Sequence, residues 1–407
     1  MNQTILDMYA DLVILKGINL KKDKSVAIMT GPGTYYFARA LSKSAYRHGA
    51  LYVQVLLDDL DVLASRLDNQ TEEQLKHTPA FIRALDYEMC AEGWAYIRID
   101  STEDRLDHAP LHQKKNQTYG TAKREFSLTR TKKTMRHELP WCVVCAPGPL
   151  WARQVLGEHA TTSDLLSVLK PILLLDKEDP LAAWDEHGAM LQARQDKLNS
   201  MHIDSLHFKS PVTDFTIGFT EKARFLGGSE TLPDGTPFFA NLPTEEIFTT
   251  PDRMRANGYI TTTRPVTVLN SRTEEVRLVF KDGKVVDYSA KEGKEILDSF
   301  FAIDEGTRRI GECALVDESS PIAQSALIFD SILLDENASC HIALGDGYPS
   351  CLTNGSLLTT EESLNEAGCN TSLMHVDFMV GSKDMNITAR TREGMDVQIM
   401  KMGHFTF

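Results

Sequence analysis

The sequence is short of long apolar runs. Runs such as Ile172–Leu175 have charged residues close by, and none approaches the roughly 20 residues that a membrane-spanning helix needs. Within residues 1–20, Asp7, Asp11 and Lys16 interrupt what would otherwise be the apolar core of a secretory signal. We therefore expect no membrane segment and no export signal, and we predict a cytoplasmic location.

Positive charge is also in short supply. The chain has 43 Lys and Arg against 57 Asp and Glu, which gives a formal net charge of -14 at pH 7. Phosphate binding needs clustered Lys and Arg, so we expect no nucleic-acid partner and no anionic membrane partner. The seven cysteines are odd in number and unevenly spread. In a cytoplasmic protein they are expected to be reduced thiols.

The order of elements in the first half predicts an α/β domain with a parallel sheet. Ser25–Met29 is typical of a buried strand, Gly31–Gly33 of a turn, Thr34–His48 of a helix and Leu51–Leu56 of a second strand. Strand, helix and strand in this order form a βαβ unit, whose strands are parallel. Further elements are expected at Phe81–Gly93 (helix), Trp141–Ala146 (strand), Gly148–Leu156 (helix) and Leu181–Leu198 (helix).

From about Ile203 onward, strands dominate. Asp282-Gly283 between two alternating apolar runs predicts a hairpin, and Tyr259–Leu269 and Ser372–Met379 have the composition of strands. Lys291–Phe301 has helical spacing. We predict an α/β scaffold domain over residues 1–200 and a strand-rich α+β domain over residues 201–407.

Three motifs in the first half lack the residues that their usual chemistry needs. The Gly31–Gly33 turn has neither the third glycine of a dinucleotide site nor the lysine of a P-loop. Cys142 and Cys145 have C-x-x-C spacing but lie in a predicted buried strand without a second ligand pair, which favours packing. His137-Glu138 begins like a zinc-protease helix, but Trp141 stands where the second histidine belongs.

Five polar side chains of the second half stand among apolar or small neighbours. They are Glu246, Glu312, His341, His375 and Asp377. A charge in such surroundings is unfavourable unless it is paired or bound to a metal. Taken singly, each has an ordinary explanation: Glu246 as surface charge, for example, or His375 and Asp377 as a hydrogen-bonded pair.

Taken together, the five residues favour a metal site. His375 and Asp377, at positions i and i+2 of an alternating strand, share one face and can converge on one ion. Carboxylates and imidazoles without thiolates suit zinc, cobalt, manganese or iron. Five ligands exceed the three that a catalytic zinc usually has, whereas five with one shared carboxylate suit two ions about 3.5–4 Å apart. The set predicts a two-metal hydrolase, with the catalytic metal site in the α+β domain of residues 201–407.

The motifs around these residues resemble those of the metal-dependent aminopeptidases typified by aminopeptidase T and aminopeptidase S. The similar segments are Asn241–Thr249, Gly311–Glu312, His341–Tyr348 and Ser372–Ser382 in the second half, and Ala45–Ala50 and Pro147–Ala152 in the first. Successive motifs are separated by 66 residues from Glu246 to Glu312, 29 to His341 and 34 to His375.

The resemblance implies a role for each residue. The five side chains would hold two divalent metal ions (Zn, Co, Mn or Mg), with Glu312 bridging them, and Glu312 and Tyr348 would act in catalysis. The activity implied is the removal of N-terminal residues from small peptides by a metal-activated water. The family's homodimer is implied as well.

A different class of enzyme would use only three of these residues. His341, His375 and Asp377 form a two-histidine, one-carboxylate set, as in non-haem iron dioxygenases that cleave the ring of a hydroxylated pyridine. Glu246 and Glu312 discriminate between the two classes, because a mononuclear iron site does not need them. A binding protein without activity is the third possibility, and the presence of all presumed ligands and of Tyr348 argues against it.

Overall fold

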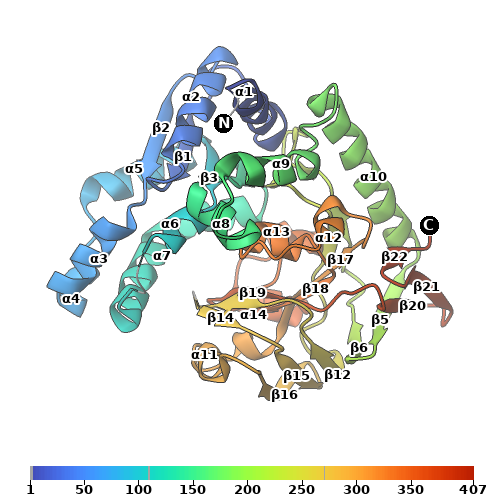
Figure 1. The fold of residues 1–407 in the computed structure, drawn as a ribbon. Coiled ribbons are helices and arrows are strands. Elements are labelled where there is room, and N and C mark those ends of the chain that lie inside the picture. Colours follow the sequence, from blue (N-terminus) through green and yellow to red (C-terminus); the bar gives the residue numbers. More distant parts are fainter. Residues whose placement is uncertain (1–2, 109–110, 270) are drawn as a thin grey trace. The chain divides into compact units, whose positions relative to one another are not determined.

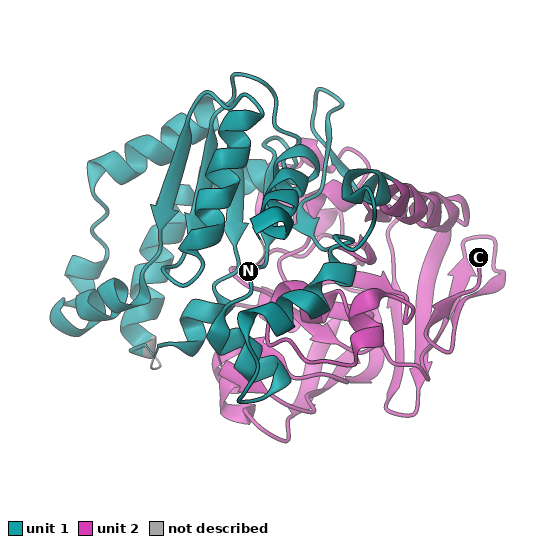
Figure 2. Cartoon of the chain, turned by 45° about the horizontal axis from the view of Figure 1, so that its top comes forward, with its two compact units in different colours: residues 1–185, 229–243 teal, residues 186–228, 244–407 magenta. Residues whose placement is uncertain are grey.

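The computed structural model describes residues 3–108, 111–269 and 271–407. Figure 1 labels its helices and strands, and Figure 2 shows two compact units. Unit 1 comprises residues 1–185 and 229–243, and unit 2 comprises residues 186–228 and 244–407. The predicted division near residue 200 stays a prediction. Within the described residues, no helix is both long and apolar enough to cross a membrane.

Unit 1 contains a five-stranded parallel sheet in the order β10-β4-β3-β1-β2. Its strands are β1 (Val26–Thr30), β2 (Val53–Leu57), β3 (Ala95–Ile99), β4 (Trp141–Val144) and β10 (Asn241–Leu242). All of the pairings between neighbouring strands are parallel. The predicted α/β class with a parallel sheet is therefore confirmed for this part of the chain.

Helices surround this sheet. In Figure 1, α2 (Tyr35–Arg47) lies beside β1 and β2, and α1 (Gln3–Leu12) packs on α2. The remaining helices of unit 1 are η1 (Val13–Gly17), α3 (Leu60–Asn69), α4 (Glu72–Leu75), α5 (Ala80–Ala91), α6 (Thr102–Leu106), α7 (Gln113–Met135), α8 (Pro149–Leu156) and α9 (Thr162–Ile172). The helices predicted at 34–48, 81–93 and 148–156 are all present.

Carboxylates occupy the places at the ends of these strands where a phosphate would bind. Gly33 N–H donates to Asp104 Oδ1 at 2.7 Å, which fixes the turn after β1. At the start of α8, Leu150 and Trp151 donate their N–H groups to Glu103 at 3.0 and 2.8 Å. Because the chain's own anions already satisfy these donors, the turn at Gly31–Gly33 is structural, as the sequence predicts.

Packing also explains the C-x-x-C pair. Cys142 and Cys145 are free thiols, and both are completely buried at or next to β4. Tyr9 packs there and donates its hydroxyl to the Cys145 carbonyl at 2.9 Å. Burial raises the pKa of both thiols, that of Cys145 to about 12, so neither is a thiolate at neutral pH.

Unit 2 is built from two antiparallel sheets that share one apolar core. The five-stranded sheet has the order β19-β18-β17-β11-β7, and the eight-stranded sheet has the order β16-β15-β12-β6-β5-β20-β21-β22. Phe208 and Phe215 of the larger sheet, Ile342 and Phe378 of the smaller one and Phe300 of a covering helix belong to the same buried cluster. The predicted strand-rich α+β class is thus confirmed.

The elements of unit 2 have the following bounds. The smaller sheet consists of β7 (Leu226–Gly227), β11 (Glu246–Thr249), β17 (Ile310–Val316), β18 (His341–Gly345) and β19 (His375–Met379). The larger consists of β5 (Ile203–Ser210), β6 (Thr213–Gly218), β12 (Ala256–Thr261), β15 (Arg277–Lys281), β16 (Lys284–Ser289), β20 (Asn386–Thr391), β21 (Asp396–Lys401) and β22 (His404–Phe405). The main helices are α10 (Pro180–Ser200), which begins in unit 1, α11 (Lys294–Phe300) and α13 (Ile332–Glu336).

One predicted strand is wrong in extent. Residues 259–269 do not form a single strand: β12 ends at Thr261, and β13 (Val266–Val268) pairs with β14 (Ser271–Thr273) in a separate small sheet. Pro265, which has no N–H to donate, lies in the break. The predicted hairpin is confirmed, with Asp282 and Gly283 at positive φ between β15 and β16.

Candidate active site

The five-stranded sheet of unit 2 has one apolar face and one face that mixes polar and apolar side chains. Ile247, Leu315, Ile342, Leu344 and Phe378 make the apolar face and are completely buried in the core. Because side chains alternate along a strand, their sequence neighbours point to the other face, which we call the ligand face. Every predicted metal ligand lies on it: Glu246, Glu312, His341, His375 and Asp377.

Alanines separate the predicted ligands across the strands. Glu312 on β17 lies opposite Ala343 on β18, and Ala343 lies opposite Asp377 on β19. Likewise, His341 lies opposite Ala314 on β17. The Cβ atoms of opposed residues are only about 4.5–5.5 Å apart. An alanine therefore leaves the space above it open to the longer side chains on both sides.

The predicted ligands meet as two groups of donor atoms that share Glu312. One group is Glu246, Glu312 and His341, the other is Glu312, His375 and Asp377, and the donor atoms of each lie within 4.8 Å of one another. His341 Nε2 is 3.2 Å from Glu246 Oε2, and His375 Nε2 is 3.1 Å from Glu312 Oε2. Asp377 Oδ1 lies 3.5 Å from His375 Nε2. All five side chains predicted as ligands are brought together.

Both imidazoles direct Nε2 toward the carboxylates. His341 Nδ1 is 3.1 Å from the Ser339 carbonyl, and His375 Nδ1 is 2.7 Å from the Asp346 carbonyl. A carbonyl only accepts, so each Nδ1 carries a hydrogen. A metal-binding histidine is commonly oriented in this way by a backbone carbonyl.

The charges of the cluster fit a cation. Asp377 Oδ1 is buried and accepts no hydrogen bond from any described residue. Across the described chain, the ion-pair partners of Glu246, Glu312 and Asp377 are histidines. Burial raises the pKa of Glu312 to about 6, although the His375 imidazole lowers it. A divalent cation would offset this clustered negative charge and satisfy the unpaired oxygen, so the residues fit a metal ion.

The pKa of His341 also fits a metal site. Burial lowers the pKa of the His341 imidazole, but hydrogen bonding and attraction to Glu246 outweigh burial and raise the pKa to about 10. The proton shared between Nε2 and the carboxylate stands where a metal ion would bind. Metal binding would therefore release it.

Tyr348 lies beside this cluster, as the resemblance implies. The centre of its ring lies 5.2 Å from the centre of the His375 ring, in an edge-on arrangement, and 5.4 Å from the centre of the Phe248 ring. Its backbone is held by Thr250, whose hydroxyl oxygen accepts from Tyr348 N–H at 2.9 Å. Burial, followed by the charge of Glu312, raises the pKa of the Tyr348 hydroxyl well above its usual value. The hydroxyl therefore remains a hydrogen-bond donor at neutral pH.

Glu336 is a residue of the site that the sequence analysis missed. It is the last residue of α13, and its carboxyl lies near Asp377. Burial and the nearby charges of Asp377 and Glu246 raise the pKa of Glu336 well above its usual value. Its only sequence signal is its position five residues before His341, within the acidic pair Asp335-Glu336.

Glu245 lies on the other side of the chain from its neighbour Glu246, as expected for an extended segment. Its carboxylate is 3.7 Å from His187 Nε2 on α10. Burial raises the pKa of Glu245 to about 8, although the nearby Arg194 lowers it. Glu245 therefore belongs to a buried polar network with His187 and Arg194.

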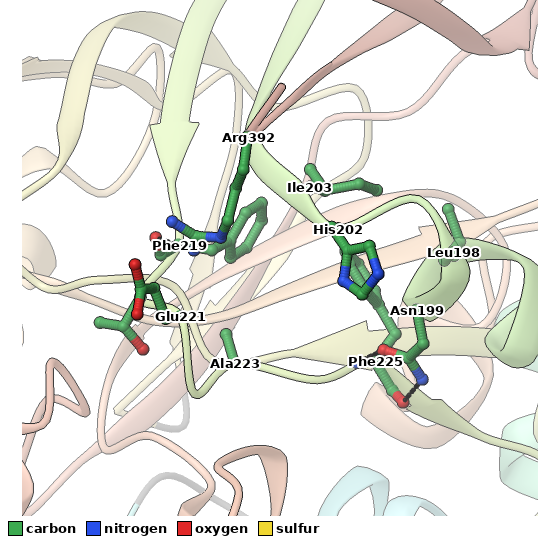
Figure 3. Close-up of a pocket in the computed structure, with 10 residues that line it drawn as sticks. Leu198, Asn199, His202, Ile203, Phe219, Glu221, Ala223, Phe225 and Arg392 are labelled. Carbon is green, nitrogen blue, oxygen red and sulfur yellow. Dashed lines mark hydrogen bonds between the residues drawn. The ribbon is translucent and has the colours of Figure 1, made fainter. Parts of the chain in front are cut away.

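A small cavity elsewhere in unit 2 is separate from this cluster. It has a volume of about 60 Å³ and is lined by Asn199, His202, Phe219, Phe225 and Arg392 among others (Figure 3). The described residues that line it include none of the predicted ligands. Its size suits one or a few water molecules rather than a peptide.

Comparison with known proteins defines the class to which the protein belongs. The chain is 33% identical over 405 residues to aminopeptidase 2 of Geobacillus stearothermophilus, which covers 99% of this chain and 98% of that protein. It is 32% identical over 403 residues to aminopeptidase T of Thermus thermophilus, with 98% of each covered. The solved structure of wild-type AmpT from Thermus thermophilus matches with a TM-score of 0.90 and 31% identity, over 100% of both chains.

These relatives confirm the predicted enzyme class, a metal-dependent aminopeptidase, which is a hydrolase that uses a divalent metal ion. More particularly, residues 2–405 match the family described as thermophilic metalloprotease (M29), and the chain belongs to that family. The resemblance found in the sequence motifs is thereby confirmed. Because these relatives are named aminopeptidases, the comparisons give the alternative of a ring-cleaving dioxygenase no support.

Proposed function

We propose that this metalloaminopeptidase works through a site for two divalent metal ions. The carrying observation is that the donor atoms form two groups that share Glu312. Glu246, Glu312 and His341 would hold one ion, and Glu312, His375 and Asp377 the other. Glu336, whose carboxyl lies near Asp377, is a further candidate ligand.

The side chains around the ions would each have a part in hydrolysis. Bound divalent ions supply Lewis-acid polarisation of the scissile carbonyl and lower the pKa of a water molecule to about 7. Glu312, shared by both groups, would help to hold both ions. Tyr348 would donate its hydroxyl to the oxyanion that develops as the water attacks, a contribution that is typically worth several kcal/mol.

The carboxylates would also manage the protons. The attacking water must lose a proton, and the leaving amine must gain one. The Glu336 carboxyl lies beside Asp377, so a carboxylate here is placed to take the proton and pass it on.

We propose small peptides with a free N-terminus as substrates, in keeping with the activity in the relatives' names. We also keep two proposals from the sequence: a cytoplasmic location and a homodimer. The cytoplasmic location is supported by the seven cysteines, which are all buried and, in the part of the chain that the structure describes, form no disulfide, as expected for reduced thiols. The homodimer is supported by the resemblance alone.

A chelation experiment tests the activity. The protein is stripped of metal with a chelator, dialysed and assayed on a panel of amino-acid p-nitroanilides after addition of Co, Zn, Mn or Mg. Activity should vanish on chelation and return with at least one of these ions. N-acetylated leucine p-nitroanilide, which lacks the free amine, is the matched control and should not be cleaved. Equal cleavage of the blocked substrate, or full activity without metal, would refute the proposal.

A further inference from the structure

Asn337 joins two segments that lie far apart in the sequence. It follows Glu336 at the end of α13, and its side chain is completely buried. Its Oδ1 accepts a hydrogen bond from Glu245 N–H at 2.7 Å, and its Nδ2 donates to the Leu333 carbonyl at 2.9 Å. One amide thus connects the helix that ends in Glu336 to the residue immediately before Glu246.

The same peptide unit is held from its other side. The Thr244 carbonyl is 2.8 Å from His187 Nε2. Burial lowers the pKa of the His187 imidazole, so at neutral pH this nitrogen meets the carbonyl as a neutral N–H donor. Both polar groups of the peptide between Thr244 and Glu245 are therefore bound by side chains, directly before the candidate ligand Glu246.

We propose that Asn337 is a positioning residue for the metal centre: through its bonds to Glu245 and Leu333 it fixes the carboxylate of Glu246 in the place where it would hold one ion. The inference rests on the proposed function, because it treats Glu246 as a ligand. Asn337 itself touches neither substrate nor metal in this account. It acts through the backbone on either side of it.

The chemistry of the asparagine side chain explains why this residue suits the position. The Glu245 N–H needs an acceptor, and the Leu333 carbonyl needs a donor, and an amide supplies both at once. Leucine has a similar size but supplies neither. Serine is shorter, so its hydroxyl cannot bridge the two groups. Either substitution releases the strand from the helix without adding charge to the site.

Asn199 provides a matched control in the same unit. Its Oδ1 accepts from Phe225 N–H at 2.8 Å and its Nδ2 donates to the Phe225 carbonyl at 2.9 Å, the second of which is drawn in Figure 3. Asn199 thus makes the same two kinds of backbone bond as Asn337. It ties the end of α10 to the segment before β7, neither of which carries a predicted ligand.

The test is a titration of the metal-free protein with Co²⁺, in which binding is measured by the visible absorption of the bound ion. We expect Asn337→Leu and Asn337→Ser to weaken the binding of one ion by about 10–100-fold, the usual effect of removing a group that orients a ligand. The second ion, held by Glu312, His375 and Asp377, should keep its affinity within about threefold. The absorption spectrum of the more weakly bound ion should change as well.

The control variants separate positioning from general stability. Asn199→Leu and Asn199→Ser should lower the Tm of the metal-free protein about as much as the Asn337 variants but leave both Co²⁺ affinities unchanged. If Asn337→Leu does not fold, as judged by circular dichroism, Asn337→Ser carries the same test. The inference is overturned if Asn337→Ser binds both ions as wild type does, or if the Asn199 variants weaken binding equally. Wild-type protein that binds fewer than two ions would instead refute the two-metal proposal.

Discussion

Ala343 and Asp377 lie directly opposite each other on the antiparallel strands β18 and β19. On its other side, Ala343 lies opposite Glu312 of β17. The side chain between these two carboxylates is therefore a single methyl group, completely buried at the floor of the cluster. The room for a metal ion between Glu312 and Asp377 depends on how small this residue is.

We therefore predict that Ala343→Leu abolishes metal binding and leaves the fold intact. The added atoms would project from the ligand face into the space between Glu312 and Asp377, where carboxylates should otherwise share an ion. Co²⁺ affinity should fall by more than about 100-fold. The measurement is a Co²⁺ titration of the metal-free protein, with circular dichroism to check the fold.

Ala343→Gly is the control for this prediction. It removes a methyl group and adds nothing, and glycine in a strand costs about 0.5–1 kcal/mol relative to alanine. Metal binding should survive within a few fold. A folded Ala343→Leu protein that binds Co²⁺ like wild type would show that the ion does not lie above this alanine.

The second prediction concerns Glu312→Gln. The amide keeps the size of the side chain but loses the charge that both donor groups share, so the affinity for both ions should fall. We expect kcat to drop by at least about a thousandfold. Glu295 on α11 is exposed and lies away from the site, so Glu295→Gln, which removes the same charge, should leave kcat and Co²⁺ affinity unchanged. Steady-state kinetics at saturating Co²⁺ would check this, and a fully active Glu312→Gln enzyme would rule out a bridging role.

The third prediction separates Tyr348 from the ligands. Tyr348→Phe keeps the ring contacts with His375 and Phe248 but removes the hydroxyl. If the hydroxyl stabilises the developing oxyanion, kcat should fall by about 10²–10³-fold, while KM and the Co²⁺ affinity change little. An unchanged kcat, or a loss of activity explained wholly by weaker metal binding, would argue against this role.

Asp317, which directly follows β17, holds the C-terminal strand β22 by hydrogen bonds. Asp317 accepts hydrogen bonds from Phe405 N–H at 2.8 Å and from Ser319 N–H at 2.8 Å, and His404 Nδ1 lies at 2.9 Å. Burial by itself raises the pKa of Asp317. The hydrogen bonds from Ser319, Phe405 and His404 outweigh this effect and lower the pKa to about 2.

The sign of this shift gives a pH-dependent prediction. Because the pKa in the folded protein, about 2, lies below the ordinary value of 3.8, the ionised carboxylate stabilises the fold above about pH 4, and that stability is lost as the pH falls toward 2. Asp317→Asn should therefore lower the free energy of unfolding by about 1–2 kcal/mol at pH 6. Urea unfolding at pH 6 and pH 3 should show the difference between wild type and variant shrinking. A difference that grows on acidification would contradict the assignment.

The sequence was sufficient to predict that these five side chains meet, because several of them interrupt apolar strands. Glu312 between Gly311 and Cys313, and His341 between Cys340 and Ile342, stand out against such neighbours. Glu336 carries no such contrast, since it ends a five-residue helix next to Asp335 and has the sequence signature of a surface acid. Its place beside Asp377 depends on tertiary packing, which a local pattern does not contain.

Two features of the fold escaped prediction for related reasons. The 23-residue helix α7 has no apolar stripe, and its cations are instead held by acids of other segments, such as Lys123 with Asp58 and Arg130 with Asp86. The segment 229–243 belongs to unit 1, where its strand β10 pairs with β4. This pairing involves only two residues of each strand. So short a pairing leaves no periodic signal in the sequence.

The most direct test of the two-metal site is anomalous X-ray diffraction from crystals of the wild-type protein loaded with Co²⁺ or Zn²⁺. Two anomalous peaks are expected in each chain, one contacted by Glu246 and His341, the other by His375 and Asp377, with Glu312 contacting both. A single peak, or peaks bound to other side chains, would contradict the account.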